Sequence, residues 1–302
     1  MELVSEMMKE KDKKVKKKSL ENKGQWGLIW FRYRKNKLAM FGLIMMCVLM
    51  ILCICSPLYI NYEEVYKQSM GNRFITPSLA HIFGTDQYGR DLFARIMYGG
   101  RISLVAGLVT VGISLALGLL FGGTAGYFGG LVDNVLMRFC DIFMAVPQIL
   151  LAMAVVAALG QGTFKMLIAL SIAAFPKYAR TIRASILTLR NQEYVEAAKC
   201  CGTSSARIIL KHLIPNGLGP VIVTATFGLG TTILSIASLG FLGIGVASPT
   251  PEWGTILSEN RTNIRYYPYL GLIPGLFIAL SVMCFNFIGD GLRDALDPRT
   301  KN

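Results

Sequence analysis

Six apolar stretches, separated by short polar segments, dominate the chain. Charge-free runs occupy residues 38–62, 102–132, 142–164, 166–176, 213–251 and 266–289. A membrane-spanning helix needs about 20 apolar residues, and five of the runs reach that length unaided. The run 166–176 is too short alone, so we extend its helix through Lys177 and Arg180. The pattern predicts an all-α, polytopic membrane protein with six transmembrane helices.

The composition and the distribution of basic residues support this class and give it an orientation. The chain is 53% hydrophobic and 16% charged, with a mean hydropathy of +0.49. Of its 31 Lys and Arg residues, twelve lie before residue 38, one is Arg138, seven lie from Lys177 to Lys211 and three follow Asp290. Basic residues favour the cytoplasmic side of a membrane protein. We therefore expect both termini and the segment 193–216 to be cytoplasmic.

The N-terminal segment 1–37 carries much of the net charge of +13. Its densest basic part, Lys9 to Lys23, precedes a stretch in which aromatic and basic residues alternate, from Trp26 to Lys37. This pattern is typical of an interfacial helix at anionic head groups, so membrane lipids are the expected partner and nucleic acid is not. A plain topogenic signal explains the same charges equally well.

Catalytic and metal-binding patterns are missing from the sequence. Five of the seven cysteines fall within or next to the predicted spans, the vicinal pair Cys200 and Cys201 lies in the cytoplasmic segment, and the two histidines, His81 and His212, lie on opposite sides. No run has the glycine-rich, Lys-containing pattern that binds nucleotide phosphates. We expect no catalytic residue, no cofactor and no metal, and any ATP hydrolysis to belong to another polypeptide.

The segment Glu193–Asn216 reads as two helices separated by a glycine, because Gly202 tolerates a left-handed turn. Its spacing resembles the EAA loop by which permease subunits of bacterial ATP-binding-cassette (ABC) importers dock on a separate ATPase. His212 and Ile214 stand where that family has an apolar residue and Leu. An ordinary cytosolic hairpin is the alternative. The resemblance implies a coupling site formed by Glu193, Glu196, Ala197, Ala198, Gly202 and Pro215.

A second set of motifs surrounds the predicted second span. Gly84-Thr85-Asp86, Gly89-Arg90-Asp91 and Arg101-Ile102-Ser103-Leu104, with Pro251-Glu252-Trp253-Gly254 later, resemble the C-type permease subunit of dipeptide, oligopeptide and nickel importers. Asp91 and Arg95 are predicted to form an i,i+4 ion pair on a short external helix. A solvated loop without a contact role is the alternative. The candidate external site residues are Asp86, Arg90, Asp91, Arg95, Arg101 and Trp253.

Together these resemblances cover nearly the whole chain. They imply five parts: a basic tail and interfacial helix at 1–37, a first span at 38–62, an extracytoplasmic loop at 63–101, a core permease domain at 102–292 that contains the coupling loop 193–216, and a cytoplasmic tail at 293–302. The implied partners are a second permease, two ATPases and an extracytoplasmic substrate-binding protein, at the bacterial inner membrane.

Peptide is the favoured cargo of such an importer, and nickel or another small solute is the alternative. Two further classes stay open from the residues alone, an ATP-independent secondary transporter and an integral-membrane enzyme. Glycines spaced four apart, Gly118 and Gly122 with Gly126 following, predict close packing between helices in any of these classes.

Overall fold

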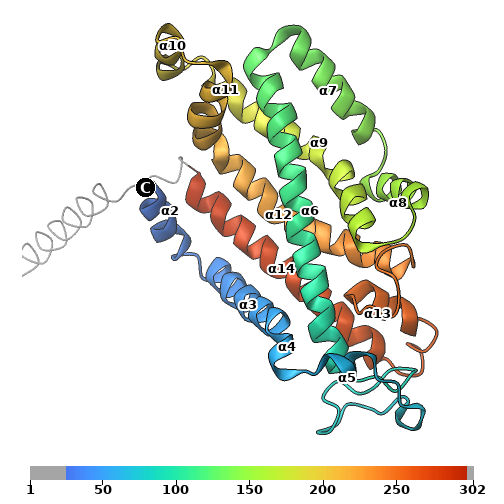
Figure 1. Cartoon of the computed structure of the whole chain (residues 1–302). Coiled ribbons are helices and arrows are strands. Elements are labelled where there is room, and N and C mark those ends of the chain that lie inside the picture. Colours follow the sequence, from blue (N-terminus) through green and yellow to red (C-terminus); the bar gives the residue numbers. More distant parts are fainter. Residues whose placement is uncertain (1–24, 298–302) are drawn as a thin grey trace, which may run out of the picture.

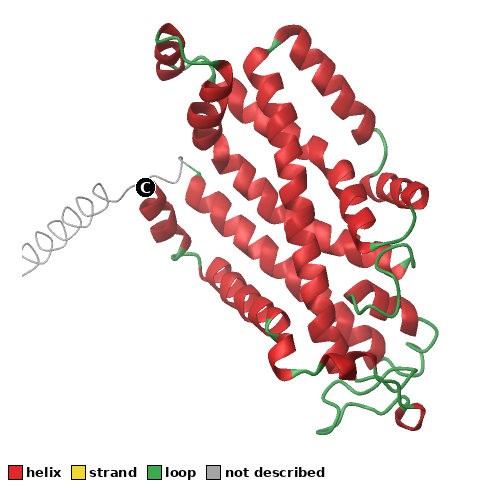
Figure 2. Cartoon of the chain, viewed as in Figure 1, coloured by secondary structure: helices red, strands yellow, loops and turns green. Residues whose placement is uncertain are grey.

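The computed structural model describes residues 25–297, and all of its regular elements there are helical (Figure 1, Figure 2). The lysine-rich start of the chain and the second half of the predicted tail at 293–302 therefore lie outside the described residues. The helices are α2 (Gln25–Tyr33), α3 (Lys37–Ile54), α4 (Ser56–Tyr59), α5 (Tyr62–Tyr66), α6 (Leu92–Phe128), α7 (Gly130–Met144), α8 (Gln148–Leu159), α9 (Thr163–Leu189), α10 (Glu193–Cys200), α11 (Ser205–Ile208), α12 (Ile214–Phe241), α13 (Trp253–Asn260) and α14 (Tyr269–Leu296).

The long helices α3, α6, α9, α12 and α14 run along a common direction, with α6 in the middle of the view in Figure 1. One end of this bundle carries α2, α10 and the C-terminal end of α14. The opposite end carries α4, α5, α13 and the loop that precedes α6 (Figure 1). The described ends of the chain therefore lie at the same end of the bundle as the predicted coupling loop.

Within residues 25–297, four helical segments are long and apolar enough to cross a membrane: 37–54, 92–128, 205–241 and 269–296. A fifth crossing is available if the bent pair α7–α8 counts as one span. The predicted span 142–164 is therefore wrong as a single straight helix, because α7 and α8 meet at an angle of 86°. The cause is Pro147, which lacks an N–H and disfavours the helical conformation at the preceding Val146.

Helix α9 is much longer than the apolar run 166–176 that predicted it. It continues through Arg180 as expected and ends only at Leu189. Its basic half is paired with α7, since Arg180 binds Asp141 and Arg183 binds both carboxylate oxygens of Asp133. These charges lower its apolar content, and α9 does not count among the four segments above.

Glycines set the distance between α6 and α9. A Cβ on Gly122 would lie 2.2 Å from the carbonyl oxygen of Ala179, and one on Gly118 would lie 2.7 Å from Cβ of Tyr178. A Cβ on Gly126 would lie 2.9 Å from Cβ of Ile186. Small residues let helix backbones approach in a membrane, where hydrophobic burial between helices is weak. The glycine spacing in the sequence thus correctly predicted close packing.

Candidate functional site

The predicted coupling loop is an exposed helical hairpin. Helix α10 projects from the bundle in Figure 1 and is attached mainly through Val195, which is fully buried. Glu193, Glu196 and Ala197 are exposed, and Ala198 is partly buried against the same core cluster as Val195. Helix α10 is therefore held to the bundle by its buried side while its acidic residues stay exposed.

The turn of this hairpin is at Gly202, which has φ of +72° and nothing within 4 Å of a hypothetical Cβ. A non-glycine residue is strained there by its backbone alone, since L side chains disfavour this conformation. The second helix differs from the prediction: it does not end near Pro215. Helix α11, a π-helical turn at Ile209–Leu213 and α12 form one continuous segment from Ser205 to Phe241.

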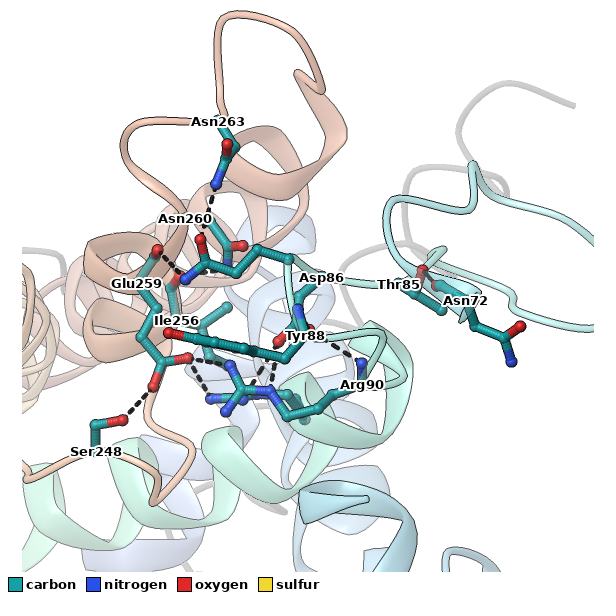
Figure 3. Close-up of polar contacts among 12 residues, drawn as sticks. Asn72, Thr85, Asp86, Tyr88, Arg90, Ser248, Ile256, Glu259, Asn260 and Asn263 are labelled. Carbon is teal, nitrogen blue, oxygen red and sulfur yellow. Dashed lines mark hydrogen bonds and ion pairs between the residues drawn. The ribbon is translucent and has the colours of Figure 1, made fainter. Parts of the chain in front are cut away.

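Two acidic and two basic side chains, three of them buried and the fourth nearly so, meet at the opposite end of the bundle. Arg90 Nε lies 2.6 Å from Asp86 Oδ2, and the other end of its guanidinium reaches Glu259 of α13 (Figure 3). Arg95 Nη2 donates to Glu259 Oε2 at 2.9 Å, and its Nη1 lies 3.4 Å from Asp86. We call Asp86, Arg90, Arg95 and Glu259 the ion cluster. The two acids are matched in number by the two guanidiniums, and together they join the loop that precedes α6 to α6 and α13.

The predicted ion pair between Asp91 and Arg95 is wrong. The Asp91 carboxylate instead caps α6 by accepting a hydrogen bond from the N–H of Ala94, and its other oxygen lies 2.8 Å from His81 Nδ1. The short external helix of the prediction is the first part of α6, which begins at Leu92. An Asp at the N-cap satisfies an otherwise free N–H of the helix, so capping competes with pairing four residues on.

Glu252 and Trp253 form hydrogen bonds that connect the start of α13 to α6. The Glu252 carboxylate accepts hydrogen bonds from the N–H groups of Gly254 and Thr255 and from the hydroxyl of Ser103 on α6. Trp253 is fully buried, and its indole N–H donates to the carbonyl of Ile96. The motifs Arg101–Leu104 and Pro251–Gly254 therefore meet, although about 150 residues separate them in the sequence.

Burial governs the protonation of the two buried carboxylates at this end of the molecule. It raises the pKa of Glu252, and the hydrogen bonds from Gly254, Thr255 and Ser103 oppose that rise incompletely. Burial also raises the pKa of Asp86, against the charge of Arg90, which lowers it.

Three of the six candidate external residues, Asp86, Arg90 and Arg95, are thus brought together. Asp91 and Trp253 lie close by with other partners, whereas Arg101 is separate and exposed. The residue that sequence reasoning missed is Glu259. Buried guanidiniums need acidic partners, and Glu259 is one of few acids on the side of the chain predicted to be external, so this requirement could have identified it.

Two regions of the chain match described families. Residues 115–302 match the binding-protein-dependent transport system inner membrane component, and residues 24–77 match the N-terminal TM domain of oligopeptide transport permease C. The chain belongs to the binding-protein-dependent transport system inner membrane component family. This permease is accordingly a multi-pass inner membrane protein of a transport system.

Curated relatives of this permease cover nearly its full length. The dipeptide transport system permease protein DppC of Alkalihalophilus pseudofirmus is 45% identical over 92% of this chain and 91% of its own. The glutathione transport system permease protein GsiD of Escherichia coli is 42% identical over 91% of both chains.

A solved structure has the same fold. An inward-facing structure of the MetNI methionine ABC transporter matches with a TM-score of 0.56 and 21% identity, over 68% of this chain and 98% of that one.

Proposed function

We propose that this permease forms half of the translocation pathway of an ATP-driven ABC importer for di- or oligopeptides. It would pair with a second permease, dock on two separate ATPase subunits and receive cargo from an extracytoplasmic substrate-binding protein. The proposal of a peptide cargo is supported by the relatives DppC and GsiD, whose names give a dipeptide and the tripeptide glutathione as substrates.

The proposed topology has six crossings: α3, α6, the bent pair α7–α8, α9, α12 and α14. An even number of crossings puts both termini and α10 on the same side, and the distribution of basic residues favours the cytoplasm as that side. Helix α9 is included because α12 and α14 would otherwise begin on the wrong sides. Its arginines are neutralised by Asp133 and Asp141, which reduces the cost of their position near the membrane.

The observation that carries the proposal is the exposed hairpin α10–α11. Helix α10 presents Glu196 and Ala197 to solvent, and Val195 holds it to the bundle. The hairpin leads through Gly202 into a helical segment that runs without interruption to Phe241. In the proposed mechanism, closure of the ATPase dimer displaces α10, and the continuous segment carries that displacement across the membrane. ATP hydrolysis belongs to the ATPases, and the permease supplies no catalytic group.

The direct test is uptake by liposomes that contain this permease with its second permease, ATPases and binding protein. A panel of labelled dipeptides and nickel would be offered with ATP, with and without the ATPases. Peptide uptake that needs the ATPases is expected. Nickel uptake alone would retain the mechanism and change the cargo, and ATP-independent uptake would overturn the proposal in favour of a secondary carrier.

The docking role of the hairpin is tested by Gly202→Asp, with Gly243→Asp as the matched control. Both glycines have positive φ, at +72° and +76°, and neither has an atom within 4 Å of a Cβ, so the backbone strain is alike. Only Gly202 lies in the hairpin. We expect Gly202→Asp to reduce ATPase co-purification and coupled uptake, and Gly243→Asp to preserve both. Equal behaviour of the two variants would refute the docking role.

A further inference from the structure

A cavity of about 710 Å³ lies beside the first turns of α6, near the end of the bundle that carries the ion cluster. Its aromatic wall consists of Tyr62, Tyr66 and Tyr98. The ring of Tyr62 lies 4.9 Å from that of Tyr66 and 5.9 Å from that of Tyr98, between ring centroids. Pockets that hold small ligands have volumes of about 300–1,000 Å³ and apolar or aromatic walls with a few polar groups. The cavity fits this description.

Arg101 supplies the positive charge of this cavity. Its side chain is exposed, and it has no ion pair with any acid in residues 25–297. This distinguishes it from Arg90 and Arg95, whose guanidiniums are both occupied by Asp86 and Glu259. A guanidinium matches a carboxylate in shape and charge and can bind it through two parallel hydrogen bonds. The cavity therefore offers a free carboxylate-binding group next to an aromatic wall.

A second hollow, of about 770 Å³, adjoins the cavity, because both are lined by Tyr62, Tyr66 and Thr250. It adds Glu63 and Lys67 to the lining. The second hollow thus carries one charge of each sign, Glu63 and Lys67, and the cavity itself carries Arg101. A zwitterion can place its carboxylate at Arg101 and its ammonium group at Glu63, whereas a bare divalent cation would be repelled by Arg101.

We infer that this cavity is the entry subsite for a short peptide with free termini. Arg101 binds the C-terminal carboxylate, the tyrosines pack against the body of the peptide, and Glu63 faces the terminal ammonium group. The inference rests on the proposed peptide cargo and names the part of the permease that first receives it. The competing occupant of the same cavity is a segment of the second permease, which makes complex assembly a necessary readout.

The probe is a dipeptide that carries a photoreactive azidophenylalanine, used as the free acid and as the C-terminal amide. It is applied to the assembled complex in nanodiscs, without the binding protein, and labelling of this subunit is measured. The free acid is expected to label roughly tenfold better than the amide, which corresponds to one charge-assisted contact. Arg101→Gln should abolish that preference, and Arg101→Lys should retain part of it. Arg265→Gln, at an exposed arginine outside the cavity, should leave the preference intact.

Val105→Trp tests the cavity by filling it, without removing a charge. Val105 and Leu108 are both exposed on α6, at 43% and 40%, but only Val105 lines the cavity. Val105→Trp should fill the cavity and reduce labelling by roughly tenfold or more, while Leu108→Trp should not. This comparison stays decisive even if Arg101→Gln fails to fold.

The outcomes separate the subsite from the proposed function. Uptake of dipeptide by the wild-type complex, with equal labelling of acid and amide or no labelling at all, would overturn the subsite and leave the importer role standing. Equal effects of Val105→Trp and Leu108→Trp would also overturn it. Loss of the second permease on purification of Val105→Trp alone would assign the cavity to the subunit interface. Failure of wild-type dipeptide uptake would remove the proposed cargo and the subsite with it.

Discussion

Glu259→Gln unbalances the ion cluster and is expected to destabilise the end of the bundle that holds α13. Glu259 is 10% exposed and accepts hydrogen bonds from both arginines and from Ser248. Neutralising it leaves the buried guanidiniums of Arg90 and Arg95 facing only Asp86. Removing one partner from a buried ion pair costs about 3–5 kcal/mol, because an uncompensated buried charge remains. We expect the free energy of unfolding to fall by about that amount.

Trp253 reports this change locally, because it lies on α13 and is fully buried. The chain has three tryptophans, so Trp26→Phe and Trp30→Phe make Trp253 the single emitter. Denaturant titration in detergent micelles, followed by tryptophan emission, then gives the unfolding free energy of this region. Arg138→Gln is the control, since Arg138 is 85% exposed in its pair with Asp141 and should contribute only about 0–1 kcal/mol.

The double variant Glu259→Gln/Arg95→Met tests the charge argument itself. It removes one charge of each sign and leaves the pair of Arg90 with Asp86, so it should be more stable than Glu259→Gln alone. If charge balance were not the cause, the second substitution would add its own cost. A Glu259→Gln variant within about 1 kcal/mol of wild type, or a double variant less stable than the single one, would refute the reasoning.

Three further predictions concern packing, capping and pH. Gly122→Ala should destabilise the fold by about 1–3 kcal/mol in thermal unfolding, whereas Gly112→Ala on the same helix, with open space at its Cβ, should not; equal effects would contradict the packing argument. Asp91→Ala should cost about 0.5–2 kcal/mol through loss of the α6 cap, and Asp91→Asn, which keeps an acceptor, should cost less. Because burial raises the pKa of Glu252, the native state binds that proton more tightly than the unfolded state. Unfolding free energy should therefore fall as pH rises from the ordinary Glu value through the raised one, and Glu252→Gln should flatten this slope; an unchanged slope would exclude Glu252 as its source.

The long helices and their packing could be predicted from the sequence because each depends on a local pattern. The apolar runs marked α3, α6, α12 and α14, and the spacing of Gly118 and Gly122 anticipated the contact of α6 with α9. The break between α7 and α8 was also encoded locally, at Pro147, but hydropathy alone passes over a proline within an apolar run.

The external site was harder to predict because its contacts join distant segments. The i,i+4 spacing predicted an ion pair between Asp91 and Arg95. Asp91 instead accepts a hydrogen bond from the N–H of Ala94, and Arg95 pairs with Glu259, more than 160 residues away. No single-sequence pattern relates such positions. The residue types were still informative, since the motif residue Arg90 and the nearby Arg95 are both buried and a buried guanidinium needs an acidic partner.

One long helical segment leads from the hairpin to α13, the helix that carries Glu259 of the ion cluster. The continuous segment Ser205–Phe241 has 37 residues, so at 1.5 Å per residue it is about 55 Å long, against a hydrocarbon core of about 30 Å. It therefore extends beyond the membrane, from the turn after Gly202 to Gly240. There it meets α13 without room for a side chain, because a Cβ on Gly240 would lie 2.2 Å from Glu252 Oε2. In the proposed mechanism, a displacement of the hairpin would reach α13 through this contact. The ion cluster joins α13 to the loop that precedes α6, so in that mechanism the two would move together.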